Sequence, residues 1–347
     1  MTSAGRHRPS LLGRLTGLTA GLTACLVVTM LLAAGIGAEP VPLAVVFDSI
    51  RRAVAHLPAG PQEHLATIFW QLRLPRVALG AIVGLALSVA GGALQGLLMN
   101  PLADPYLVGV SAGAALGASA ALLLHIGDLG GGLAKCLIAF LSGAGAMAIV
   151  LWLARSRRGI SREAFLLSGV VVGSFLWALV TMVMTFAGTE LQAIVHWLMG
   201  NLSSEVNWSV IAVAAALVLG GCIALYSYAR DLNLLALGEE QARQLGVETE
   251  PLKLGVILLA ALVTAAAVSV SGIIGFVGLV VPHIARKLVG PDHRLLLPAA
   301  GLLGAAFLVW ADTLARGIGE YFPVGVLTAL LGAPFFFHLL RRRPRAA

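Results

Sequence analysis

Residues 94–113, LQGLLMNPLADPYLVGVSAG, place Asn100, Pro101, Asp104 and Pro105 between two apolar runs. Each proline lacks a backbone N–H donor, so a helix cannot pass through this stretch unbroken. Freed backbone groups at membrane depth need partners, and the side chains of Asn100 and Asp104 can bond to nearby backbone groups. The stretch therefore predicts a tight turn that joins two apolar helices. A plain capped turn without further role is the alternative.

The composition of the whole chain indicates an integral membrane protein. Of its 347 residues, 59% are hydrophobic and 11% are charged, whereas soluble domains have about 45–50% apolar and about 25% charged residues. The mean hydropathy is +0.94. Apolar stretches of about 20 residues recur along the chain, which is the length of a membrane-spanning helix.

These stretches predict an all-α polytopic membrane protein with about ten transmembrane helices. A cytoplasmic N-terminal tail (1–14) precedes a single transmembrane domain (15–340), and a basic cytoplasmic tail (341–347) follows. A signal peptide is an alternative for the first span, although an apolar run of about 22 residues exceeds the usual length. The predicted spans are 15–37, 75–98, 105–124, 133–153, 164–186, 208–228, 254–272, 276–289, 295–318 and 324–340.

The positions of Lys and Arg predict the orientation. With both termini in the cytoplasm, 17 of the 23 cations lie inside, as the positive-inside rule requires. Topology therefore accounts for the net charge of +7 without nucleic acid as a partner. The six predicted outside cations, which need a separate reason, are Arg51, Arg52, Arg73, Arg76, Lys135 and Arg316.

A weak internal repeat predicts two inverted halves. At an offset of 181 residues, Gly91 matches Gly272 and Pro101 matches Pro282. Because an odd number of spans separates the copies, they would run in opposite directions, as in many transporters. A chance match between Gly-rich helices is the alternative.

Longer segments carry a resemblance to a known family. RLPRVALGAIVGLALSVAGGALQGLLMNPLADPYLVGVSAGAALG (73–117), LNLLALGEEQARQLGV (232–247) and SGIIGFVGLVVPHIARKLVG (271–290) resemble permease subunits of type II ATP-binding cassette importers. The likeness continues in 292–305 and 322–340. Such permeases import ferric siderophores, haem and vitamin B12. The resemblance implies a homodimer in the bacterial inner membrane, two cytoplasmic ATPase subunits and a periplasmic substrate-binding protein.

The resemblance also assigns an ATPase dock to the polar segment 229–253. Gly238 and Gly246 bracket a short amphipathic helix there, which favours a partner surface over a solvated loop. The expected coupling residues are Leu234, Leu237, Gly238, Glu239, Ala242, Leu245 and Gly246.

Two further sites follow from the resemblance. Asn100, Pro101 and Leu102 match positions that narrow the cytoplasmic exit of the pathway. A second constriction near residues 161–163 is not assigned, because Arg162 and Glu163 stand where some relatives have small hydroxyl residues. The expected binding-protein dock consists of Arg73, Arg76 and Arg316. The alternative is that these arginines snorkel to lipid headgroups.

The chain has no ATPase motif of its own. Its three lysines, Lys135, Lys253 and Lys287, are not followed by Ser or Thr, so a P-loop is excluded. The sequence therefore predicts a transport subunit rather than an enzyme, without cofactor or metal site, powered by a separate ATPase.

The predicted function is the homodimeric pathway for an iron chelate, either a ferric siderophore or haem. A cobalamin permease of the same family is one alternative. Another is an ion-coupled secondary transporter, which would need ionisable residues near the bilayer midplane. Glu190 and Asp312 are the nearest candidates, and both lie close to span ends.

Overall fold

The computed structural model describes residues 11–37, 39–56, 62–126, 130, 132–156, 159–202, 207–319 and 322–341. Most of these residues are helical, and two short strands form an antiparallel hairpin, β1 (Arg155–Ser156) and β2 (Gly159–Ile160). The longer helices are α1 (Leu11–Gly35), α4 (Leu74–Leu97), α5 (Val110–Leu123), α6 (Leu133–Ala154), α7 (Arg162–Thr185), α9 (Trp208–Ser227), α12 (Thr249–Ser271), α13 (Val277–Val289), α14 (His293–Ile318) and α15 (Val324–Arg341). The shorter ones are α2 (Leu43–Val54), α3 (Glu63–Thr67), η1 (Ile68–Arg73), η2 (Pro105–Val108), η3 (Gly188–Glu190), α8 (Leu191–Leu198), α10 (Ala229–Leu235) and α11 (Glu239–Gln244).

All ten predicted spans coincide with helices, which confirms an all-α polytopic membrane protein. Among the described residues, seven helical segments are long and apolar enough to cross a membrane. The helices α5 and α13, which follow the two breaks in the bundle, have only 14 and 13 residues. The exact number of spans and the cytoplasmic placement of the termini stay predictions.

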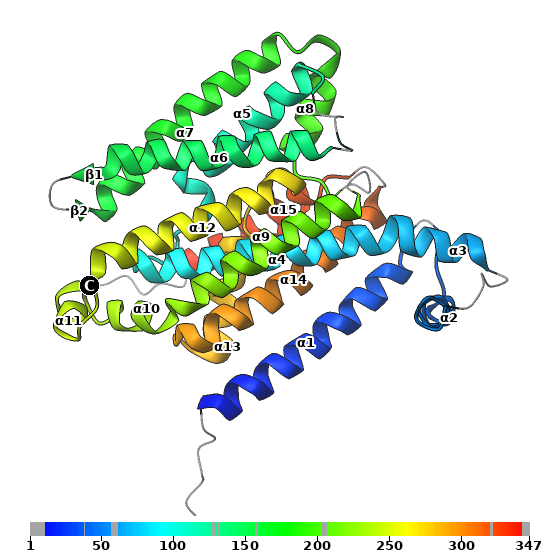
Figure 1. Cartoon of the computed structure of the whole chain (residues 1–347), viewed down its shortest axis with the longest axis horizontal. Helices are drawn as coiled ribbons and strands as arrows, with labels where there is room; N and C mark the ends of the chain where they lie inside the picture. The colour runs from blue at the N-terminus through cyan, green and yellow to red at the C-terminus, as the bar shows by residue number, and fades with distance from the viewer. Residues whose placement is uncertain are drawn as a thin grey trace, which may run out of the picture.

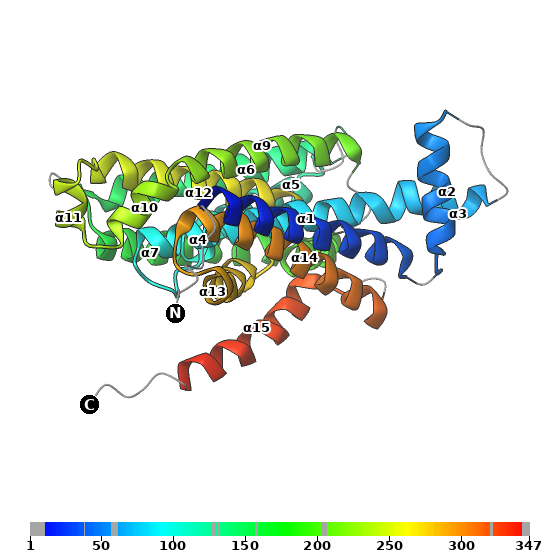
Figure 2. The ribbon, with the colours of Figure 1, turned by 90° about the horizontal axis from the view of Figure 1, so that it is seen from below.

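Figure 1 shows the helices in three layers. The helices α5, α6 and α7 pack against one another on one side, α4, α9 and α12 run through the middle, and α1, α13 and α14 lie on the other side. In the perpendicular view of Figure 2, α15 diverges from the bundle. Leu330 and Phe337 of α15 are exposed.

The central helix is α4, which contacts α9, α12, α13 and α14. It is apolar on all sides and nearly all of its residues are buried, as expected of an enclosed helix. A methyl group on Gly84 would overlap the carbonyl of Gly304 in α14, and one on Gly91 would overlap that of Gly278 in α13. Glycine at these contacts lets the backbones approach closely, which drives helix association in lipid.

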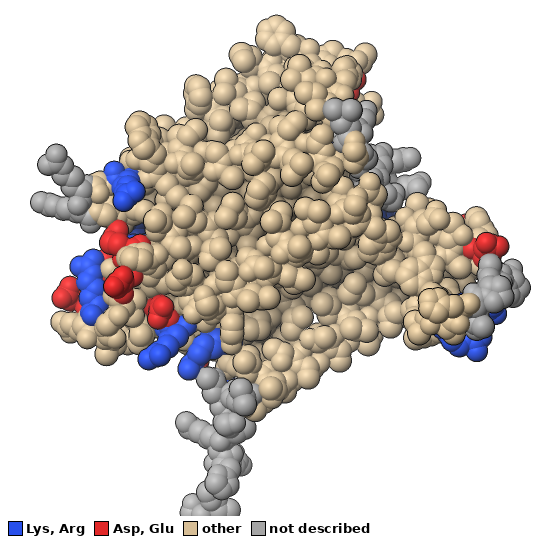
Figure 3. Space-filling model, viewed as in Figure 1, with Lys and Arg blue, Asp and Glu red and all other residues tan. Residues whose placement is uncertain are grey.

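Charged side chains gather at the two ends of the face in Figure 3 and leave an uncharged belt between them. One end carries α10, α11 and the β1–β2 hairpin, and the other carries α2 and α3. The Lys and Arg of the predicted inside set that the structure describes lie toward the α11 end, so the predicted orientation places this end at the cytoplasm. Figure 2 shows α2 lying across the direction of the spans at the outer end.

The two prolines that the predicted repeat pairs, Pro101 and Pro282, occupy different kinds of structure. Pro101 lies in the turn between α4 and α5, whereas Pro282 lies inside α13. The inverted repeat therefore stays a prediction, without support from this pair of residues.

Candidate transport and coupling site

The turn between α4 and α5 is held by the local bonds that its sequence predicts. The Asn100 side chain accepts a hydrogen bond from the Leu102 N–H at 3.0 Å, and Asp104 accepts one from Tyr106 N–H at 2.9 Å. Gly109 then adopts a left-handed conformation, with φ of 81°, at the residue before α5. The turn is thus an ordered structure, and Asn100, Pro101 and Leu102 are half-buried within it.

Tyr106 joins this turn to a second break, residues 272–276 between α12 and α13. Its hydroxyl donates to the Ile274 carbonyl at 2.9 Å and accepts from the Ile274 N–H at 3.1 Å. Among the residues that the structure describes, neither backbone group of Ile274 has a backbone partner. This bond could not be predicted from the sequence, because the two residues lie 168 positions apart.

Gln95 of α4 donates to a backbone carbonyl that lacks its usual helical donor. Pro282 has no N–H to donate to the carbonyl four residues before it, that of Gly278. The Gln95 side-chain amide lies 3.4 Å from this oxygen and 3.2 Å from that of Leu279, and donates to both. A polar side chain in the last turn of the buried, apolar α4 therefore stabilises the proline-containing start of α13.

The segment 229–253 contains the short helix α11 between Gly238 and Gly246, where the sequence predicts one, together with α10 before it and the start of α12 after it. Gly238, with φ of 123°, precedes α11, and Gly246, with φ of 86°, follows it, so both occupy backbone conformations that favour glycine. The Leu237 and Leu245 side chains are 63% and 59% exposed. By contrast, Ala242 is buried, so its side chain supports this surface from beneath rather than belonging to it.

One anchor ties α10 to the start of α14. The Asn233 side chain donates to Asp292 at 2.7 Å and accepts from the His293 N–H at 2.8 Å. Hydrogen bonds from Arg294 are the main cause that lowers the pKa of Asp292 to about 2, and the bond from Asn233 adds to it. Asp292 is therefore ionised at neutral pH and holds α10 against the bundle.

A second anchor ties α11 to α12 and to the hairpin before α7. The Lys253 ammonium lies 2.8 Å from a Glu239 oxygen and 2.9 Å from a Glu250 oxygen, and Glu250 accepts from the Ile160 N–H of β2 at 3.0 Å. Burial opposes the ionisation of Glu239, but its contacts with Lys253 and Arg243 outweigh burial and lower its pKa. Lys253 thereby joins the predicted ATPase dock to the segment that enters the bundle as α7.

Five of the six predicted outside cations have partners within the chain. On α2, Asp48 pairs with Arg51 at 2.8 Å and with Arg52 at 2.6 Å. Arg73 donates to the carbonyls of Ile36 and Glu39, which follow α1. These contacts explain how cations are accommodated at the outer end.

Arg76 and Arg316 share the buried carboxylate of Asp312. Arg76 donates to both of its oxygens at 2.8–3.0 Å, and the Arg316 guanidinium lies 3.2 Å from it. Arg316 also donates to the carbonyls of Ala33 and Ile36, at 3.2 and 3.0 Å, near the end of α1. The docking role predicted for Arg73, Arg76 and Arg316 stays a prediction, and the last two side chains are mostly enclosed.

Comparison with known proteins identifies the architecture. The model of the FecCD transport family matches residues 25–342. The chain belongs to this family. It is thus an ATP-binding cassette importer permease, a transport subunit that crosses the bacterial inner membrane several times.

The FecCD relatives differ in substrate. The chain is 45% identical over 294 residues to the "Cobalamin import system permease protein BtuC" of Halobacterium salinarum, covering 83% of this chain and 77% of the relative. It is 43% identical over 282 residues to the "Hemin transport system permease protein HmuU" of Yersinia pestis, covering 80% and 84%. The permease YvrB of Bacillus subtilis is 42% identical and covers 92% of both chains.

A solved FecCD-like fold agrees with this membership. A chain from a transporter described as a metal-chelate type ABC transporter in an inward-facing conformation superposes with a TM-score of 0.79 at 33% identity. The match covers 95% of this chain and 100% of that chain.

Proposed function

We propose that two copies of this FecCD permease form the pathway of an ATP-driven importer for an iron chelate, haem or a ferric siderophore. A periplasmic binding protein delivers the chelate, and two separate ATPase subunits supply the energy. Family membership over residues 25–342 is the observation that carries the proposal. Cobalamin is the alternative cargo, since relatives named for cobalamin and for hemin are 45% and 43% identical.

The proposed ATPase contact is the exposed surface of Leu237 and Leu245 on either side of α11. Two exposed leucines at a polar cytoplasmic end are suited to an apolar groove on a partner. Gly238 sets the direction of α11, and Glu239 keeps α11 attached to α12 through Lys253. A push on α11 would therefore be carried into the bundle rather than absorbed by a loose loop.

The proposed cytoplasmic gate is the turn with Asn100, Pro101 and Leu102. Its connection through Tyr106 to residues 272–276 supports this role, because movement of the turn would carry the second break with it or break two hydrogen bonds. The hairpin before α7 receives the push from α11 through Lys253 and Glu250.

The ion-coupled alternative finds less support. A secondary transporter needs a carboxylate that can bind and release the driving ion. Asp312 has two arginines as partners, Arg76 and Arg316, whose guanidinium groups occupy its oxygens. Glu190 lies in η3, outside the long helices.

Reconstitution into proteoliposomes tests the proposal. We expect uptake of haem or a ferric siderophore only with ATP, the ATPase subunit and the binding protein encoded with this chain. Uptake of cobalamin, but not of haem or a ferric siderophore, would support the alternative cargo. Uptake driven by an ion gradient without the ATPase would refute the proposal that the chain belongs to an ATP-driven importer. Gly238→Trp should abolish ATPase co-purification without affecting dimerisation.

A further inference from the structure

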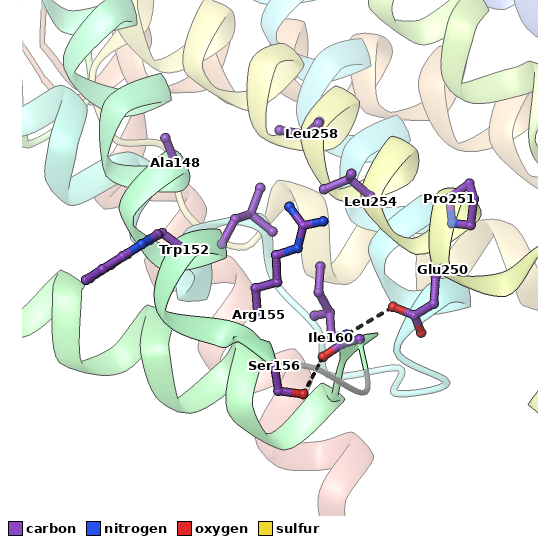
Figure 4. A pocket seen from close by; sticks show the side chains of 11 residues that line it. Ala148, Trp152, Arg155, Ser156, Ile160, Glu250, Pro251, Leu254 and Leu258 are labelled. Atoms are coloured by element: carbon purple, nitrogen blue, oxygen red, sulfur yellow. Dashed lines mark hydrogen bonds between the residues drawn. The ribbon is translucent and has the colours of Figure 1, made fainter.

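A groove at the α11 end lies between α6, α12 and the β1–β2 hairpin, and its apolar walls have no part in the proposed transport function. Its volume is about 730 Å³, within the range of roughly 300–1,000 Å³ that is usual for sites of small ligands. Figure 4 shows the groove with the side chains that line it, which come from the end of α6, the start of α12 and the hairpin.

The walls of the groove are apolar helix faces. Ala148, Leu151 and Trp152 lie three and four positions apart and so share one face of α6. Leu254 and Leu258 form the facing wall on α12 in the same way. Trp152 is 76% exposed near the end of α6, a typical place for an interfacial aromatic side chain.

Arg155 provides the charge at the mouth of this groove. In Figure 4 its side chain extends from the end of α6 toward Leu254. Within the described part of the chain, its guanidinium has no hydrogen-bond acceptor or carboxylate as a partner. The nearby Glu250 is already engaged, because its oxygens accept from Lys253 at 2.9 Å and from the Ile160 N–H at 3.0 Å.

The dimensions and the charge fit one class of ligand. From Ala148 to Arg155, α6 rises by about 10 Å, so the apolar wall reaches from the charged end toward the bilayer interior. A guanidinium fork matches the oxygens of a phosphate group. Anionic lipids are enriched in the cytoplasmic leaflet, and basic pockets between transmembrane helices on that side bind their headgroups.

We propose that this groove binds an anionic phospholipid of the cytoplasmic leaflet, with its phosphate on Arg155 and an acyl chain along the apolar wall that Leu151 and Leu258 contribute. The site does not depend on the transported substrate. Its position suggests a consequence for transport, because Ile160 and Glu250 belong both to the groove lining and to the connection that reaches α11.

Native mass spectrometry of the purified full chain, exchanged from micelles containing phosphatidylglycerol or phosphatidylcholine, tests the proposal. We expect one phosphatidylglycerol per subunit to be retained about tenfold better than phosphatidylcholine, the factor that one charge-assisted hydrogen bond represents. Arg155→Gln should remove this preference, and Arg155→Lys should keep part of it. Arg230→Gln, which removes an exposed cation of α10 outside the groove, should leave it unchanged.

A second measurement separates lipid from a free anion. The fluorescence of Trp152 is identified as the signal that Trp152→Phe removes. Phosphatidylglycerol with brominated acyl chains should quench this signal, and excess inorganic phosphate should not reverse the quenching. Ala148→Trp, which fills the groove, should lower retention while Arg155 is intact. Equal retention by Arg155→Gln and the unchanged protein, equal losses in Arg155→Gln and Arg230→Gln, or displacement by phosphate would each overturn the proposal.

Discussion

The buried carboxylate of Asp312 yields a sharp prediction, since the chain contains an exposed counterpart. Asp312 and Asp48 each pair with two arginines at 2.6–3.2 Å. The Asp312 side chain is 3% exposed, whereas that of Asp48 is 38% exposed. The same substitution at the two sites therefore compares burial while the chemistry is held constant.

Asp312→Asn leaves Arg76 charged and enclosed without a carboxylate. Removing one partner of a buried pair costs about 3–5 kcal/mol, largely because the other charge cannot be solvated. Arg316 keeps its bonds to the α1 carbonyls, so we expect a loss near the lower end, about 3 kcal/mol. For Asp48→Asn, where water replaces the carboxylate, we expect about 0–1 kcal/mol.

The assay is reversible unfolding in mixed micelles, with the free energy of unfolding extrapolated to zero denaturing detergent. The double variant Arg76→Gln with Asp312→Asn should lose less stability than the sum of the single variants, since no charge is then left unpaired. Similar small losses at both aspartates would refute the reasoning. That result would mean that water reaches Arg76 and Arg316, which would favour their predicted role in docking the binding protein.

Three further predictions concern packing, coupling and pH. Gly91→Ala should cost about 1–3 kcal/mol because the new methyl group overlaps the backbone of α13, whereas Gly145→Ala, which meets open space on α6, should not destabilise the protein. Lys253→Met should lower uptake per ATP hydrolysed in proteoliposomes while ATPase binding persists, and Lys287→Met, an exposed cation of α13, should leave that ratio unchanged. Because the pKa of Asp292 is lowered from 3.8 to about 2, its stabilising contribution is complete above 3.8 and is lost as the pH falls toward 2. The difference in melting temperature between the unchanged protein and Asp292→Asn should accordingly be constant near neutral pH and shrink below about pH 4.

The features that the sequence predicted well are those encoded by neighbouring residues. Apolar runs of span length are helices, and prolines with Asn100 and Asp104 end α4 where expected. Gly238 and Gly246 bracket α11 because a positive φ is a local property of the backbone. Each of these signals needs no knowledge of what the segment packs against.

Features that depend on distant partners were not predictable in this way. Only the fold brings Arg76 to Asp312, which lies 236 positions away. The pairing of Arg316 with Asp312, by contrast, follows an i,i+4 spacing within α14 that is visible in the sequence. Ala242 shares the helix of the predicted coupling surface, yet its position relative to the bundle buries it. Amphipathic spacing identifies a helix face but not which part of that face a neighbouring element already covers.

The two breaks in the bundle restrict how the pathway can open. The turn at 98–109 and the segment 272–276 lie in different halves of the chain, yet Tyr106 bonds to both backbone groups of Ile274. Residues 272–276 in turn lie against the ends of other elements, since a methyl group on Gly200 or Gly325 would overlap the Ile273 carbonyl. The cytoplasmic gate proposed at Asn100 and Leu102 could therefore not move as an isolated loop. It either breaks two buried hydrogen bonds, which would leave polar groups without partners at membrane depth, or it moves together with the second break.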